Sequence, residues 1–363
     1  MVNEIYNKLK NVKYPGFEKD IMSFNCVKNV TLSGDEALIE VELFAANPEL
    51  ANTLKKDIEQ ALKSLNLKLN LKIIQPNAPQ EQSNTQSGAN LAPQIKNFVM
   101  ISSGKGGVGK STTSVNLAIS LAKMGKKVGL LDLDIYGPNI PRMLGIESAS
   151  PEVDGVKLKP ILSHGVETMS MGVLMAQGQS IVWRGAMIMK AVTQLLSDVL
   201  WGELDVLIMD MPPGTGDAQI SIAQNVPVSA GICVTTPQLV ALDDSRRSLD
   251  MFEKLHIPVA GLIETMSGFL CPDNGKIYDI FGKGGAQKLA NEYKCELLAQ
   301  IPLEMSVVEA GDSGKPISFY EPESVSAKAY YNAASKLLEF LDKVNSQGLA
   351  DNSSIQPTQH TGC

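Results

Sequence analysis

The stretch from Gly104 to Ser111 reads GKGGVGKS, and it decides the fold. It fits the pattern G-x-x-x-x-G-K-[ST], it follows the apolar run 98–102, and it opens a helical pattern that continues to Met124. Glycines let consecutive backbone N–H groups turn inward around an anion, and the helix N-terminus adds its positive end. The sequence therefore predicts a strand, a phosphate-binding loop and a helix.

Three side chains of this loop suggest nucleotide chemistry. Lys110 would neutralise β and γ phosphate oxygens, and the Ser111 hydroxyl would complete a Mg²⁺ shell. Lys105 stands early in the loop, where most phosphate loops have no lysine, so it is either a second cation for the phosphates of a facing subunit or a solvent-facing lysine. The predicted nucleotide contacts are Gly104, Lys105, Gly106, Gly107, Val108, Gly109, Lys110, Ser111 and Thr112.

Acidic residues follow two predicted strands and support the same site. Asp210 ends the apolar run 206–209 and would hold Mg²⁺ through water. Asp134 ends the segment 130–134, where an acid can orient the attacking water. The next segment after Asp210, residues 212–217, resembles a switch that senses the γ-phosphate.

Short apolar runs alternate with amphipathic stretches on both sides of the loop. We expect strands at 99–101, 128–131, 206–209, 231–234 and 259–263, and helices at 110–124, 186–200, 239–255, 284–293 and 326–343. The strands are almost continuously apolar, as strands covered on both faces are. The pattern predicts an α/β fold with a mostly parallel, doubly wound sheet, which binds ligands at the carboxyl ends of its strands.

A polar segment at 75–94, with the single charge Glu81, predicts a flexible linker. It would separate a small α+β domain at 1–74 from the P-loop NTPase domain at 95–343, and a disordered polar tail would follow at 344–363. Within the small domain we expect helices at 3–10 and 48–65 and strands at 21–30, 37–44 and 67–74.

Composition narrows the class of protein. The chain has 363 residues, 44% of them hydrophobic, and a net charge of −7, so it is an ordinary globular protein and not a basic nucleic-acid wrapper. Its five scattered cysteines suggest a reducing compartment, and neither a signal peptide nor an 18-residue apolar run is expected. The sequence therefore predicts a cytoplasmic protein without a membrane partner.

Several longer strings resemble the Mrp/ApbC family of iron–sulfur cluster carrier ATPases. They are KGGVGKS at 105–111, DLDIYGPNIP at 132–141, MPPGTGD at 211–217, TTPQ at 235–238 and GDSGKP at 311–316. The first of them is similar to the deviant P-loop of the ATPases that include MinD, ParA and the nitrogenase iron protein. The small domain is similar, more weakly, to a domain related to iron–sulfur assembly factors.

The resemblance implies a homodimer with ATP at the subunit interface and slow ATP hydrolysis. In that arrangement Lys105 acts on the partner's nucleotide, Lys110 acts within its own subunit, and Asp134 orients the water. Ser111 and Asp210 hold Mg²⁺. The resemblance also implies a bridging [4Fe–4S] cluster, held by a C-x-x-C from each subunit and delivered to target apoproteins.

This sequence departs from the family pattern at two positions. Residues 271–275 read CPDNG, so Asn274 stands where the second cysteine is expected, and a dimer would offer two Cys271 thiolates in place of four. Cys271 is then either a cluster ligand or a leftover surface thiol. Thr265 stands where the family usually has an Asn that reads the adenine edge, a task that a hydroxyl can perform in part.

Two other functions remain open. One is a ParA/MinD-like switch, and the other is a regulatory ATPase without a cluster. MinD-like membrane attachment needs a basic amphipathic C-terminal helix, and residues 346–363 contain no Lys or Arg. The net charge of −7 argues against a DNA-binding role, so we expect no nucleic-acid partner.

Overall fold

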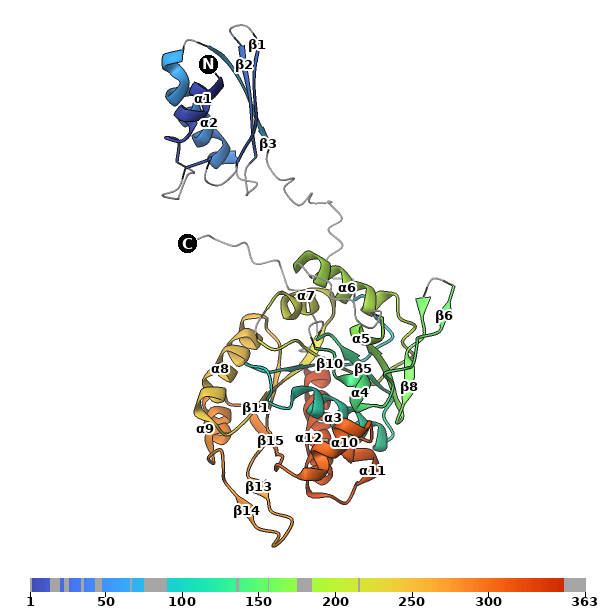
Figure 1. Cartoon of the computed structure of the whole chain (residues 1–363). Helices are drawn as coiled ribbons and strands as arrows, with labels where there is room; N and C mark the ends of the chain where they lie inside the picture. Colours follow the sequence, from blue (N-terminus) through green and yellow to red (C-terminus); the bar gives the residue numbers. More distant parts are fainter. Residues whose placement is uncertain are drawn as a thin grey trace. The chain divides into compact units, whose positions relative to one another are not determined.

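The computed structural model (Figure 1) describes residues 2–13, 20–22, 26–33, 36–42, 48–65, 67–74, 90–134, 137–155, 157–174, 185–214 and 216–348. The chain divides into two units, Met1–Gln86 and Ser87–Cys363. Residues 75–89 of the predicted linker lie outside the described residues. Its last residues belong to the large unit, because Ala92 is buried and the Leu91 N–H donates to the Asn225 carbonyl at 3.3 Å.

The small unit has a sheet in the order β1 (Val27–Ser33), β2 (Glu36–Glu42), β3 (Lys68–Ile74). The β1–β2 pair is antiparallel and the β2–β3 pair is parallel. Two helices, α1 (Val2–Leu9) and α2 (Pro48–Leu62), pack on this sheet, and a 3₁₀ turn, Lys63–Leu65, follows α2. The shared core contains Ile5, Leu9, Val30, Ile39, Val41, Leu54, Ile58 and Leu62.

The predicted strand at 21–30 is wrong over its first half. The strand β1 starts at Val27, whereas Ile21 lies in a turn. The Ile21 carbonyl oxygen accepts a hydrogen bond from the Cys26 N–H at 3.0 Å. Ile21 is nevertheless fully buried in the domain core. A buried turn therefore imitates the apolar alternation of a strand.

The large unit contains, among its described residues, an eight-stranded sheet in the order β15-β12-β11-β4-β10-β5-β9-β8. In that order the strands are Glu296–Gln300, Val259–Glu264, Val228–Thr235, Phe98–Ser102, Val206–Asp210, Val128–Asp132, Val166–Ser170 and Ile161–Ser163. All neighbouring pairs are parallel except the antiparallel pair β8–β9. This confirms the predicted mostly parallel sheet.

Helices cover both faces of this sheet. On one face α3 (Lys110–Lys123) and α12 (Val325–Gln347) pack over Val99 and Ile101, and Figure 1 shows these two helices side by side. On the other face Phe98 and Met100 lie in a second core with residues of four helices. These are α6 (Gly185–Ser197), α7 (Asp217–Asn225), α8 (Leu239–Lys254) and α9 (Gly285–Glu292). The sheet is therefore doubly wound, as predicted.

Short elements complete the large unit. They are the helices α4 (Ile140–Met143), α5 (Met171–Leu174), α10 (Met305–Ser313) and α11 (Ile317–Tyr320), and the hairpins β6 (Val153–Asp154) with β7 (Lys157–Leu158) and β13 (Phe269–Leu270) with β14 (Ile277–Tyr278). The last helix continues beyond the predicted boundary at residue 343, because α12 ends at Gln347 and Gly348 takes the left-handed conformation of a helix C-cap. No helix in the described residues is long and apolar enough to cross a membrane.

Candidate functional site

The phosphate loop connects β4 to α3, and its glycines have different structural roles. Gly107 and Gly109 have φ values of 77° and 78°, which favour glycine. At Gly104 a Cβ atom would lie 2.2 Å from the backbone of Asp244 at the start of α8, so the residue there must lack a side chain. Gly106 has neither constraint, so the left-handed φ that favours glycine occurs in this loop at Gly107 and Gly109 and not at Gly104 or Gly106.

The loop ends in a buried polar network around Asp210, the last residue of β10. The Lys110 ammonium donates to Asp210 Oδ2 at 2.7 Å, and the Ser111 hydroxyl donates to the same oxygen at 2.7 Å. Ser114, one turn further along α3, donates to the other carboxylate oxygen at 2.6 Å. Carboxylate and hydroxyl oxygens are hard ligands, so this donor set fits the Mg²⁺ that the sequence implies. Ser114 has no counterpart in the sequence predictions.

A second buried carboxylate lies beside this network. Asp132 ends β5, is the register partner of Asp210, and has no exposed surface. Burial, followed by the neighbouring charge of Asp210, raises the pKa of Asp132 to about 7, although Ser170 donates to its carboxylate at 2.8 Å. Asp132 is not among the predicted site residues, although the DLD spacing at 132–134 signals an acid on each side of Leu133.

Asp134 lies in the loop after β5, and its backbone N–H donates to the Asp132 carboxylate at 3.1 Å. Its own carboxylate accepts a hydrogen bond from the Gly137 N–H at 3.3 Å, so the two acids and this loop form one hydrogen-bonded unit.

Lys105 is half-buried near the start of the phosphate loop, at the end away from Lys110. Its ammonium has no ion-pair partner within the described ranges, while its carbonyl accepts a hydrogen bond from Ser103 at 3.0 Å.

The predicted switch segment 212–217 is held by a side chain that sequence analysis missed. Gln219 is fully buried, and its amide donates to the carbonyls of Pro212 and Gly214 at 3.1 and 2.9 Å. Its amide oxygen accepts a hydrogen bond from the Gly216 N–H at 3.0 Å. The Gly214 N–H also donates to the Ser103 carbonyl, which connects the segment to the phosphate loop. Thr215 lies outside the described residues.

A cavity of about 240 Å³ lies next to the phosphate loop. Its lining includes Gly109, Thr112, Thr265, Pro302, Leu303, Glu304 and Tyr330. The Thr265 hydroxyl lies 2.6 Å from the Val108 carbonyl and 3.0 Å from the Thr235 carbonyl. Because a hydroxyl has one hydrogen, Thr265 can offer a ligand in this cavity only a hydrogen-bond acceptor.

Cys271 lies directly after β13, at the start of the turn of the β13–β14 hairpin, and is half-exposed. Asn274 stabilises this turn, because its amide oxygen accepts a hydrogen bond from the Lys276 N–H at 2.9 Å and its amide group donates to the Tyr278 hydroxyl at 3.2 Å. The hairpin is bonded to the wall of the cavity through Leu303, whose N–H donates to the Gly268 carbonyl. The Leu303 carbonyl in turn accepts a hydrogen bond from the Leu270 N–H.

The other described cysteines have different surroundings. Cys26 and Cys233 are buried, and burial raises the pKa of Cys233 to about 12. Burial also raises the pKa of the half-buried Cys295 to about 11. The structure does not describe Cys363. Among the residues that it does describe, no three His, Cys, Asp or Glu side chains form a group that could hold a metal ion.

Comparison with protein-family models shows to which family the chain belongs. A family model described as ParA, NUBPL iron-transfer P-loop NTPase, matches residues 94–338. The chain belongs to this family. A second model, described as iron–sulfur cluster assembly protein, matches residues 3–70 of the small unit. The matches confirm the resemblance that the motifs at 105–111, 132–141 and 211–217 suggest.

Curated relatives are similar to the chain over 68% to 99% of its length. It is 52% identical to an iron–sulfur cluster carrier protein of Helicobacter pylori over 363 residues, which cover 99% of this chain and 98% of the relative. It is 41% identical to the iron–sulfur cluster carrier protein of Escherichia coli, with 91% and 89% covered. The mouse iron–sulfur cluster transfer protein NUBPL is 46% identical, with 68% and 78% covered.

Solved structures agree with the family fold. A nucleotide-binding protein from Archaeoglobus fulgidus in complex with ADP is 35% identical, with a TM-score of 0.57 and with 66% of this chain and 91% of that chain covered. The cell division ATPase MinD of Pyrococcus furiosus is 23% identical, with a TM-score of 0.51 and with 67% and 98% covered. The second similarity shows the fold alone.

Proposed function

We propose that this chain binds and slowly hydrolyses ATP with Mg²⁺, and that as a cytoplasmic homodimer it carries an iron–sulfur cluster to target apoproteins. One observation carries the proposal: the buried Lys110–Ser111–Asp210 network ends a phosphate loop in a chain 52% identical, over its full length, to an iron–sulfur cluster carrier protein. The ADP complex of the Archaeoglobus fulgidus protein supports the nucleotide part.

Each residue around the phosphate loop has a separate role in binding or hydrolysing the nucleotide. Lys110 neutralises phosphate charge, which requires it to exchange its bond with Asp210 for one with a phosphate oxygen. Ser111 and Asp210 hold Mg²⁺, which when bound supplies further charge neutralisation at the phosphates. Asp134 orients the attacking water. The cavity beside Gly109 and Thr112 receives the nucleoside, and Thr265 accepts a hydrogen bond there.

The cargo would bind at Cys271. It is half-exposed on a hairpin, whereas Cys26 and Cys233 are buried and the pKa of Cys295 is raised to about 11. Two copies of the chain would bring two Cys271 thiolates together, and a cluster of four irons normally takes four protein ligands. The shortage predicts a weakly held cluster, which suits transfer better than storage.

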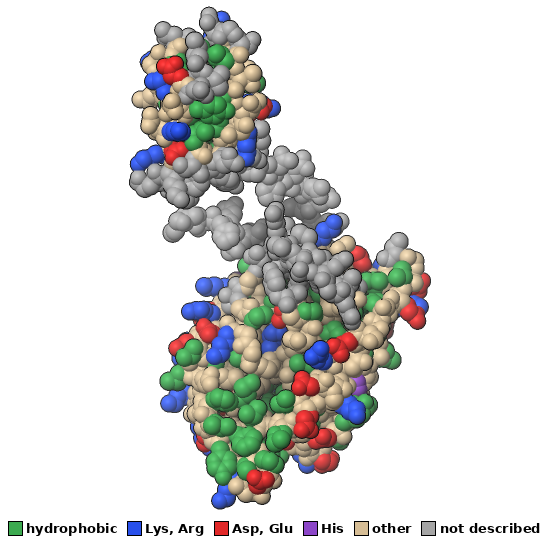
Figure 2. Space-filling view, viewed as in Figure 1, with side chains coloured by type: hydrophobic (Ala, Val, Ile, Leu, Met, Phe, Trp, Pro, Cys, Tyr) green, Lys and Arg blue, Asp and Glu red, His purple; other side chains and the backbone are tan. Residues whose placement is uncertain are grey.

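Exposed apolar side chains support the second copy. Leu239 and Val240 at the start of α8 are 77% and 68% exposed, and Ile277 and Ile280 on and beside β14 are 56% and 60% exposed. Figure 2 shows hydrophobic side chains gathered over this part of the large unit. A monomer rarely leaves such a patch in water, so a partner surface would cover it. Lys105 would then act on the partner's nucleotide.

One observation favours a second function, a regulatory ATPase without a cluster. Asn274 replaces a ligand, and both ends of its amide are engaged in the hairpin turn. A turn built around an amide in this way is suited to a structural role. The alternative keeps the nucleotide chemistry and removes the cargo.

The experiment combines ATP hydrolysis with anaerobic cluster reconstitution of the full-length chain. The wild type should hydrolyse ATP only with Mg²⁺, and Lys110→Ala should lose nucleotide binding in calorimetry. Iron and sulfide should bind in the wild type and in Cys295→Ala but not in Cys271→Ala. Equal iron in Cys271→Ala and Cys295→Ala would contradict the cargo site, and an unchanged ATP affinity in Lys110→Ala would contradict the nucleotide site.

A further inference from the structure

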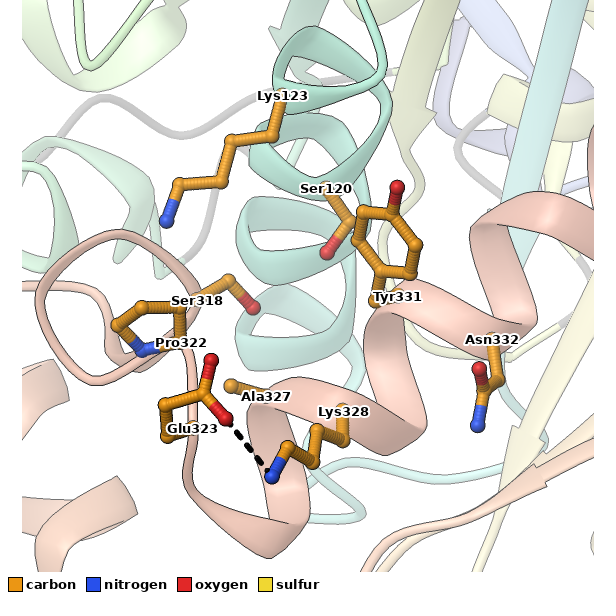
Figure 3. A pocket seen from close by; sticks show the side chains of 9 residues that line it. All are labelled: Ser120, Lys123, Ser318, Pro322, Glu323, Ala327, Lys328, Tyr331 and Asn332. Carbon is orange, nitrogen blue, oxygen red and sulfur yellow. Dashed lines mark ion pairs between the residues drawn. The ribbon is translucent and has the colours of Figure 1, made fainter.

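A second cavity, of about 380 Å³, lies between α3, α12 and the segment that follows α11 (Figure 3). It shares no lining residue with the cavity beside the phosphate loop. Ser120 and Lys123 reach it from the C-terminal part of α3, whose first residue is Lys110. Since a helix rises 1.5 Å per residue, Ser120 lies about 15 Å along α3 from the phosphate loop. The proposed ATPase function leaves this cavity unused.

One wall of the cavity contains a buried hydroxyl without a partner. Ser318 of α11 is 3% exposed, and its Oγ makes no hydrogen bond in the part of the chain that the structure describes. Figure 3 shows this hydroxyl directed toward the middle of the cavity. Its backbone is fixed, because the Ser318 N–H donates to the Asn116 side chain at 3.0 Å. An unsatisfied buried hydroxyl is costly, so its position here suggests that a ligand accepts its hydrogen bond.

The rim of the cavity carries two ammonium groups. Lys123 donates to the Phe319 carbonyl at 3.1 Å, and Lys328 pairs with Glu323 at 2.9 Å. The Glu323 side chain is 87% exposed, so this is a weak surface pair that an incoming anion can replace. Two cations and an unused hydroxyl are all hydrogen-bond donors, and together they select an oxyanion over a neutral or cationic group.

We propose that this cavity binds a small organic anion, with a carboxylate or phosphate monoester group, at a site separate from the nucleotide. The oxyanion accepts hydrogen bonds from Ser318 and from Lys328, which exchanges its pair with Glu323 for the ligand, and Lys123 adds positive charge at the rim. The Pro322 and Tyr331 side chains provide apolar surface for the rest of the molecule. Both oxyanions have the same donor requirements, so the experiment must distinguish them.

The test uses the full-length chain with its phosphate loop saturated by Mg²⁺ and ADP. Inorganic phosphate, malonate and glycerol 3-phosphate are titrated separately in a calorimeter, and the one that binds identifies the oxyanion. We expect saturable binding of at least one probe, and about tenfold or greater weakening in Ser318→Ala and in Lys328→Gln, because each loses a hydrogen bond to a charged group. Lys343→Gln, an exposed lysine of the same helix away from the cavity, should bind like the wild type.

A thermal melt without probe separates binding from a structural role. Ser318→Ala removes an unpartnered buried hydroxyl, so its Tm should equal or exceed that of the wild type while its affinity falls. If the Tm of Ser318→Ala falls instead, that variant has lost stability, and only the affinity of Lys328→Gln for the probe tests the proposal. The proposal is overturned if none of the three probes binds to the wild type. It is equally overturned if binding survives in the deciding variants, or if Lys343→Gln weakens it as much as they do.

Discussion

At the scale of single residues, the phosphate loop shows what a motif can and cannot predict. The spacing of Lys110 and Ser111 after the glycines predicted a phosphate site, because the pattern itself carries that chemistry. It did not show that Gly104 is required by the backbone of Asp244, since α8 lies far away in the sequence. Gly107 and Gly109 take left-handed φ values of 77° and 78°, whereas Gly106 does not.

This difference gives a test with a matched control inside the same loop. Gly104→Ala should lower the free energy of unfolding by about 1–3 kcal/mol, because its Cβ would overlap the Asp244 backbone. Gly106→Ala, where a Cβ meets nothing within 4 Å, should change it by less than about 0.5 kcal/mol. Urea unfolding of the two variants measures both values. Equal losses would show that the close approach at Gly104 has no energetic weight.

The acids of the site were only partly predictable for a related reason. Asp210 was expected beside Lys110 because a strand after a phosphate loop commonly ends in an acid. Asp132 acquires its raised pKa from burial and from its register partner Asp210, and register cannot be read from a strand's own residues. In the sequence, nothing distinguishes Ser114 from other serines in a helix. Its role becomes visible only in the fold, where its hydroxyl lies 2.6 Å from the Asp210 carboxylate.

At the scale of elements, the sequence predicted the interior strands and missed the outer ones. The strands β4, β5 and β10 are buried at every position and read as unbroken apolar runs. At the edge of the sheet, β15 exposes Glu296 and Gln300, so its pattern resembles a loop. In β9, Glu167 and Thr168 interrupt the apolar run that a strand search requires.

One carboxylate ties the beginnings of three strands together and predicts a pH dependence. Asp205, just before β10, accepts hydrogen bonds from the Lys96 ammonium at 2.7 Å, before β4, and from the Lys127 N–H at 2.9 Å, before β5. The Lys96 hydrogen bond is the main cause that lowers the pKa of Asp205 below its ordinary value of 3.8. A carboxyl with a lowered folded-state pKa stabilises the fold above its unfolded pKa and loses that effect as pH falls through the folded value.

Asp205→Asn should therefore lower the free energy of unfolding by about 0.5–1 kcal/mol at pH 7, a modest loss because solvent screens the Lys96 pair. The difference from the wild type should shrink as pH falls below about 4. Asp342→Asn, an exposed acid of α12, serves as the control and should show no difference. Urea unfolding across this pH range measures the effect, and a difference that stays constant down to low pH would refute it.

At the scale of the whole molecule, the proposed nucleotide site and the proposed cargo site at Cys271 both contact the segment 301–304. Leu303 lines the cavity beside the phosphate loop and hydrogen-bonds the hairpin that carries Cys271. Thr265 and Cys271 could be predicted only as separate positions, because nothing in their spacing places both beside the segment 301–304. In the proposed homodimer, the second copy would supply Lys105 to the nucleotide and Cys271 to the cargo.

The role of Lys105 can be tested through assembly. Its ammonium has no ion-pair partner in the described part of the chain, so Lys105→Ala should fold and bind ATP like the wild type. It should lose most ATP hydrolysis and the dimer that forms with ATP and not with ADP, because the charge acting on the partner's phosphates is gone. Sedimentation velocity with each nucleotide, with Lys343→Ala as the control, measures this. Identical assembly of both proteins with and without nucleotide would rule out the role of Lys105 across the interface.

The number of thiolate ligands that a dimer supplies to a cluster gives the last prediction. The wild-type dimer supplies two thiolates, so it should bind a [4Fe–4S] cluster weakly or substoichiometrically, and Asn274→Cys should raise occupancy toward one cluster per dimer. The change also removes the two hydrogen bonds of the Asn274 amide from the hairpin turn. Asn274→Ser loses the same amide without adding a thiol, so it is the matched control. Anaerobic reconstitution, with iron, sulfide and visible absorbance, compares the three proteins.

Cys271→Ala in the Asn274→Cys background separates the possible outcomes. If the gain depends on both thiols, it should disappear in the double variant, because each subunit then offers one ligand again. If the wild type already holds a full cluster that survives Cys271→Ala, the ligands lie elsewhere, with Cys295 and Asp273 next to be tested. If Asn274→Cys gains no more iron than Asn274→Ser, the hairpin no longer serves a cluster. The regulatory ATPase would then account better for a turn in which Asn274 bonds both Lys276 and Tyr278.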